Sequence, residues 1–122
     1  MLNMTDAMVY AMDTPGALAV AFVEFKTARA VAGFGEDKID FDRMTPDWTE
    51  LLLAQTQHLD AKEWHNPVND VVVTTNSRHH VLRPLRDPAY SDMYLYLVLD
   101  KNAGSIPLAR YRLHDMEDHL AL

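Results

Sequence analysis

Histidine is the residue type of this chain best suited to metal binding or acid–base chemistry, and the spacing of its six copies argues against a metal site. His79 and His80 are adjacent in a predicted strand, so their side chains point to opposite faces of the sheet. His114 and His119 stand five residues apart on a predicted helix, whereas metal-binding pairs on helices usually stand three or four apart. We therefore expect no bound metal ion.

Signatures of nucleophilic catalysis and of phosphate binding are missing from the sequence. It has no cysteine, and Ser77, Ser91 and Ser105 stand outside any Gly-x-Ser-x-Gly motif. The four glycines are scattered rather than grouped as in a phosphate-binding loop. Carboxylates and histidines are too dispersed to favour an acid–base enzyme. We expect a protein without catalytic residues and without a cofactor.

The chain of 122 residues is acidic, with 18 Asp and Glu against 11 Lys and Arg and a net charge of −7. A nucleic-acid binder needs a basic face that replaces counterions on phosphate, so this balance argues against one. It also argues against docking on an anionic membrane surface. No apolar stretch approaches the roughly 20 residues that cross a bilayer, and the N-terminus carries no secretory signal. We therefore expect a cytoplasmic protein.

One basic cluster stands out against this acidic background. Arg78, Arg83 and Arg86 lie along one predicted strand and the loop after it, beside His79 and His80. Arginines grouped in this way could bind a carboxylate or a phosphate on a partner. They could equally keep the strand soluble and limit pairing between sheet edges.

The uncharged stretch Met93–Leu99 is the element around which we expect the chain to be organised. It is too short for an ordinary helix, and no polar residues alternate within it, so it predicts a strand buried on both faces. Such a strand lies in the middle of a sheet, with helices above and below it. The turn residues Asp100–Gly104 end the strand, and Ser105 with Pro107 predicts the start of a helix.

The remaining patterns predict an α+β fold in one domain, residues 1–122. Helices are predicted at 2–13, from Thr45 to about Lys62, and after Ser105, and further strands at 17–25, 30–34, 70–75 and 78–85. Thr45 would cap the middle helix, with Pro46 at its first position. Five strands joined mainly by hairpins predict an antiparallel sheet. The middle helix is expected on one face and the terminal helices on the other.

The middle helix carries more apolar surface than one sheet face requires. Its predicted core stripe consists of Trp48, Leu51, Leu52, Gln55 and Leu59. Leu53 falls outside this stripe. The excess indicates either a wide core stripe or contact with a second subunit, and the pattern alone does not choose between them.

Three local patterns, in this order of elements, resemble the Roadblock family of dynein-light-chain-related domains. The first is a helix that ends in Pro15-Gly16 and continues into a small-residue strand. The second is the strand–turn–strand at 19–33, where Ala28 replaces the family's turn glycine. The third and most specific runs from Leu99 through Gly104 to Leu108-Ala109-Arg110.

This resemblance implies a profilin-like, five-stranded antiparallel sheet in the order 2-1-5-4-3. It also implies a homodimer in which the middle helix and the third strand meet their symmetry mates. The interface residues expected from it are Leu53, Gln57, Val71, Val72, Val73 and Thr74. Members of the family perform no chemistry themselves and serve as scaffolds or regulators of small Ras-like GTPases and motor complexes.

The resulting hypothesis is a dimeric adaptor that binds a small GTPase and modulates its nucleotide cycle. The expected partner-binding residues are Arg78, Arg83 and Arg86, together with the acidic segment at 36–42. The alternative is a profilin-like or GAF-like sensor, whose sheet and helices enclose a small ligand. A pocket beside Tyr94 or Tyr96 would favour the sensor, and a filled core would count against it.

Overall fold

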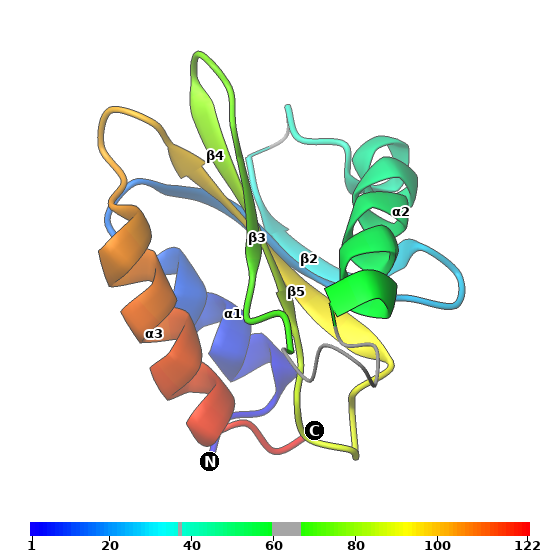
Figure 1. The fold of residues 1–122 in the computed structure, drawn as a ribbon. Coiled ribbons are helices and arrows are strands. Elements are labelled where there is room, and N and C mark those ends of the chain that lie inside the picture. The colour runs from blue at the N-terminus through cyan, green and yellow to red at the C-terminus, as the bar shows by residue number, and fades with distance from the viewer. Residues whose placement is uncertain (37, 60–66) are drawn as a thin grey trace.

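A computed structural model describes residues 1–36, 38–59 and 67–122 of the chain, which form three helices and one five-stranded sheet (Figure 1). The elements are α1 (Met4–Met12), β1 (Ala17–Glu24), β2 (Arg29–Gly35), α2 (Phe41–Leu59), β3 (Val71–Thr74), β4 (Arg78–Pro84), β5 (Met93–Asp100) and α3 (Ile106–Asp118). The predicted α+β class is confirmed.

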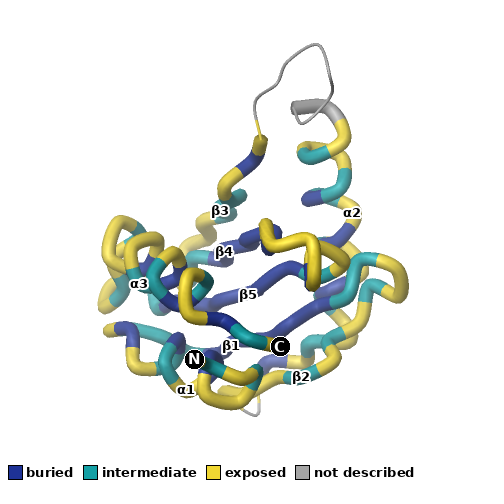
Figure 2. Tube along the Cα trace, turned by 90° about the horizontal axis from the view of Figure 1, so that it is seen from below, coloured by how far each residue is buried: buried dark blue, intermediate teal, exposed yellow. Residues whose placement is uncertain are grey.

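The sheet has the order β2-β1-β5-β4-β3, and every neighbouring pair is antiparallel. The predicted order and the predicted central strand are therefore both confirmed. Residues 94–99 of β5 are completely buried, as Figure 2 shows along the middle of the sheet. Local turn chemistry ends this strand as expected, because the Asp100 carboxylate accepts the backbone N–H groups of Asn102 and Ala103.

Side chains that alternate along β5 build two separate cores. Tyr94, Tyr96 and Val98 pack under α2, whereas the side chains between them pack under α1 and α3. Helix α2 therefore covers one face and the terminal helices cover the other, as predicted (Figure 1). The two chain ends meet there, since the N–H of Leu2 donates to the His119 carbonyl at 2.7 Å.

The predicted start of the middle helix is wrong. Helix α2 begins at Phe41, and Pro46 lies inside it rather than at its first position. The Asp40 carboxylate accepts the backbone N–H of Arg43 at 3.3 Å, a bond typical of an N-cap. The added turn packs Phe41 edge-on against Tyr96 with ring centres 6.1 Å apart. This packing offsets the backbone bond that Pro46 cannot make. The predicted end of the helix near Lys62 lies outside the described residues.

Candidate interaction surfaces

Among the described strands, β3 is an edge of the sheet, and its apolar side chains divide between the two faces. Val71 and Val73 stand opposite Leu82 and His80 of β4, on the face that α2 covers. Val72 points to the other face and packs against the core there. Both Val71 and Val73 remain half-buried. An apolar edge strand that stays open favours pairing with another chain.

One flank of α2 faces the β4 strand next to β3. Trp48 packs against His80 with ring centres 4.9 Å apart, and both Trp48 and Leu51 are half-buried. Together with Val71 and Val73 they are the half-buried apolar side chains at this border of the sheet, which we name the β3–α2 edge. The sequence pattern assigned Trp48 and Leu51 to the core stripe. The sequence pattern does not say which side of the stripe faces β3, because that depends on how α2 crosses the sheet.

Leu53 and Gln57 lie on the opposite flank of α2. With Phe25 and Ala28 they line a shallow groove next to the turn between β1 and β2. The structure of the single chain therefore does not bring these two residues together with β3. Their place in a dimer interface stays a prediction, as does that of Thr74, whose hydroxyl shares a hydrogen bond with His79 Nδ1.

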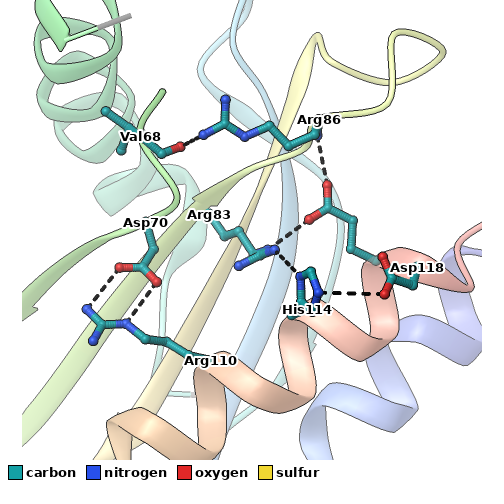
Figure 3. Close-up of polar contacts among 8 residues, drawn as sticks. Val68, Asp70, Arg83, Arg86, Arg110, His114 and Asp118 are labelled. Atoms are coloured by element: carbon teal, nitrogen blue, oxygen red, sulfur yellow. Dashed lines mark hydrogen bonds and ion pairs between the residues drawn. The ribbon is translucent and has the colours of Figure 1, made fainter. Parts of the chain in front are cut away.

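The three predicted partner-binding arginines do not form one patch. Arg78 and Arg83 are separated along β4 and belong to opposite faces of the sheet, because side chains alternate along a strand. Arg83 is buried, and its Nε donates to a Glu117 carboxylate oxygen at 2.9 Å (Figure 3). The other Glu117 oxygen accepts the backbone N–H of Arg86 at 2.8 Å. Arg83 therefore joins β4 to α3. A partner-binding role for the three arginines stays a prediction.

Two arginines also hold the segment that leads into β3. The Arg86 guanidinium donates to the carbonyl of Val68 (Figure 3). Arg110 of α3 makes two hydrogen bonds to the Asp70 carboxylate, at 2.9 and 3.0 Å. The Asp70 side chain is 9% exposed and that of Arg110 is 51% exposed. The start of β3 is thus tied to the helix on the far face of the sheet.

The space beside the two central tyrosines is filled. Tyr94 shares a hydrogen bond with the Thr49 hydroxyl at 2.8 Å, and Tyr96 shares one with His80 Nδ1 at 2.7 Å. Burial raises the pKa of each phenol to about 12. Burial also lowers the pKa of His80 below its ordinary value, and the charge of Arg78 lowers it further. This closed, hydrogen-bonded arrangement counts against a ligand sensor with a pocket at these residues.

The acidic segment after β2 lies at the surface, where Glu36, Asp40 and Asp42 are exposed. Asp37 lies outside the described residues. Within the described ranges, no group of three histidine or carboxylate side chains could hold a metal ion. No helix in the same ranges is long and apolar enough to cross a membrane.

No protein-family model and no curated protein matches the sequence. Solved structures do match the fold. A Roadblock/LC7 domain from Streptomyces avermitilis superposes with a TM-score of 0.77 at 13% identity, over 97% of this chain and 94% of that one. The chain has the Roadblock/LC7 fold.

Two further solved structures superpose on this chain over most of its length. MglB from Myxococcus xanthus gives a TM-score of 0.75 at 14% identity, over 94% of this chain and 91% of that one. An MglB in a tetrameric arrangement gives 0.73 at 13% identity, over 94% of this chain and 82% of that one. Because the likeness covers nearly the whole chain, the Roadblock/LC7 fold accounts for all of the described helices and strands.

Proposed function

We propose that this protein is a non-catalytic homodimeric adaptor that regulates a small Ras-like GTPase, either by modulating its nucleotide cycle or by scaffolding its complex. The observation that carries the proposal is the β3–α2 edge, an apolar border of the sheet that the single chain covers only in part. The Roadblock/LC7 fold supports the proposal, because the Roadblock family that the sequence resembles consists of regulatory dimers. MglB itself occurs in a tetrameric arrangement, which supports assembly through more than one copy.

In the proposed dimer, two copies of β3 pair antiparallel around a two-fold axis. This arrangement is isologous, so the same surface of each copy contributes. Backbone groups of Val71–Thr74 would continue the sheet across the axis. Val71, Val73, Trp48 and Leu51 would bury their remaining apolar surface against the partner helix and strand. Leu53 and Gln57 lie on the other flank of α2, so they would take part only if the partner helix also reaches that flank.

The oligomeric state tests this dimer directly. Val73→Lys places a charge in the β3–α2 edge and should convert a dimer into a monomer, measured by light scattering or sedimentation at micromolar concentration. Val31→Lys is the matched control, because Val31 is 50% exposed on β2, the opposite open edge of the sheet. It should leave the dimer intact. A wild-type protein that sediments as a monomer at tens of micromolar would contradict the proposal.

Leu53→Asp tests the contribution of the second flank of α2. If this flank takes part in the interface, the variant should weaken the dimer, whereas Asp47→Ala, at an exposed position of α2 that does not line this groove, should not. An unchanged dimer affinity in Leu53→Asp would remove Leu53 from the interface. It would leave the β3–α2 edge as the contact.

The GTPase partner is proposed from the fold and from the exposed charges. Arg78 is half-exposed on β4, and the acidic residues Glu36, Asp40 and Asp42 lie at the surface. These groups could contact switch segments or phosphate-proximal loops of opposite charge. A Ras-like GTPase from the neighbouring genes should bind the purified protein in one nucleotide state, and its rate of GTP hydrolysis or exchange should change. Absence of binding in every nucleotide state would refute this part.

A further inference from the structure

The short lead-in to β3 is fixed to the rest of the molecule at two points (Figure 3). Arg86, from the loop after β4, holds the backbone at Val68. Arg110, from α3, holds Asp70, the residue immediately before the strand. A guanidinium that donates two parallel hydrogen bonds to one carboxylate fixes both its distance and its orientation.

Strand β3 needs such a support because its own pairing is short. It has four residues, and its one neighbour among the described strands is β4. A slip of one residue would turn every side chain to the other face of the sheet. Val71 and Val73 would then leave the face of α2, and Asp70, Val72 and Thr74 would take their place, so the β3–α2 edge would exchange two valines for one.

The direction of Asp70 opposes this slip. Val72 packs into the core under α1 and α3, and Asp70 lies two residues earlier, so both side chains point to that face. There Asp70 meets Arg110. In the slipped register Asp70 would face α2 instead, and its carboxylate would be separated from the guanidinium by the sheet.

We propose that the Asp70–Arg110 ion pair is a register lock for β3, and that Arg110 is a positioning residue for dimerisation although it lies outside the β3–α2 edge. This inference rests on the proposed dimer. It adds that the interface depends on a helix on the opposite face of the sheet. The Arg86 contact with the Val68 carbonyl supports the same segment two residues before Asp70.

The test compares Arg110→Ala with Arg112→Ala. Arg112 is a matched control, because it also lies on α3 and also donates hydrogen bonds to a neighbouring element, but its partners are Thr14 and Tyr10. Arg110→Ala should weaken the dimer by about tenfold, as expected for loss of a coupled pair. It should also accelerate hydrogen exchange of the amides at 71–74. Arg112→Ala should change neither quantity by more than about twofold.

Two further variants distinguish an effect on the register of β3 from an effect on the overall stability of the protein. Arg110→Lys keeps the charge but loses the two-pronged geometry, so it should restore part of the affinity. The exchanged pair Asp70→Arg with Arg110→Asp should bind more tightly than either single variant. Equal weakening in Arg110→Ala and Arg112→Ala would overturn the register lock. So would unchanged exchange and affinity in Arg110→Ala while Val73→Lys abolishes the dimer.

The experiments give a different result if the proposed dimer does not form than if the register lock is wrong. If the wild-type protein is a monomer, sedimentation rejects the proposed dimer, and Arg110 loses its role in dimerisation. Hydrogen exchange of β3 in that monomer still measures the register lock alone. Faster exchange in Arg110→Ala but not in Arg112→Ala would support it, and equal exchange would refute it.

Discussion

Gly16 and Gly104 lie backbone against backbone, where the turn before β1 meets the turn after β5. A Cβ atom on Gly16 would stand 2.6 Å from the backbone nitrogen of Gly104, and Gly16 has a φ of +83°. The Gly16 carbonyl also accepts the N–H of Asp100 at 2.8 Å. Two of the three sequence patterns that resemble the Roadblock family thus meet in space, and glycine is required where they touch.

Gly16→Ala should destabilise the fold by about 3 kcal/mol, since it combines an unfavourable positive φ with a steric overlap. Chemical denaturation measures the change. Ala103→Ser, at the exposed neighbour of Gly104, is the control and should alter the free energy of unfolding by less than about 0.5 kcal/mol. A Gly16→Ala protein as stable as wild type would show that the two turns can separate at little cost.

Glu117→Ala should destabilise the protein by about 3 kcal/mol, because it leaves the Arg83 guanidinium without its carboxylate in a largely buried site. The side chains of Arg83 and Glu117 are only 11% and 10% exposed. The same change removes the acceptor of the Arg86 backbone N–H. Thermal or urea unfolding provides the measurement. Asp118→Ala, one residue along α3 and exposed, should have little effect, and equal effects of the two changes would refute this account.

Folding stability should fall as the pH is lowered below about 6.5, the ordinary pKa of histidine. The pKa of His80 is lower in the folded protein than in the unfolded chain, chiefly because of burial, so the unfolded chain binds the proton first. The contribution of neutral His80 is complete above pH 6.5 and is lost as the pH falls toward the folded-state pKa. Urea unfolding between pH 7.5 and 5 measures this slope.

His80→Gln removes this titration and should flatten the pH dependence of the free energy of unfolding, even though it weakens packing against Trp48 and Tyr96. His119→Gln is the control, because it removes an exposed imidazole at the end of α3. It should leave most of the slope in place. If His80→Gln retains the full slope, another group is responsible.

Ala28→Gly should stabilise the protein by about 0.5–1 kcal/mol. Ala28 has a φ of +58°, a conformation that favours glycine, and it occupies the turn position where the Roadblock family has one. Thermal unfolding reports the gain. Ala30→Gly, in the adjoining strand, should have the opposite sign, because it adds backbone freedom and removes a packed methyl group. Loss of stability in Ala28→Gly would mean that the turn is not strained.

Elements whose pattern is local were predictable from the sequence. The unbroken apolar stretch at 93–99 predicted a central strand, since only a strand covered on both faces can do without polar positions. Ser105 caps α3 as predicted, with its hydroxyl accepting the N–H of Leu108. The sheet order was an expectation from the family resemblance, and the helix placement followed from the hairpin pattern and the chain ends. The structure confirms both.

Packing between residues distant in the sequence decided where α2 begins and where the arginines lie. Helix α2 begins at Phe41, before its Thr45-Pro46 signal, because Phe41 packs against Tyr96. The basic cluster that looks continuous along the sequence divides between two faces of the sheet, since strand side chains alternate.

Local patterns in this sequence determined which segments become helices or strands, because hydrophobic period, caps and turn residues act within a few positions of one another. The tertiary structure alone decided which side of α2 adjoins the open edge, and which charges meet. Arg83 and Glu117 are 34 residues apart, and Asp70 and Arg110 are 40 apart. Such pairs form because the folded sheet and helices bring distant residues together, and no local signal encodes that proximity.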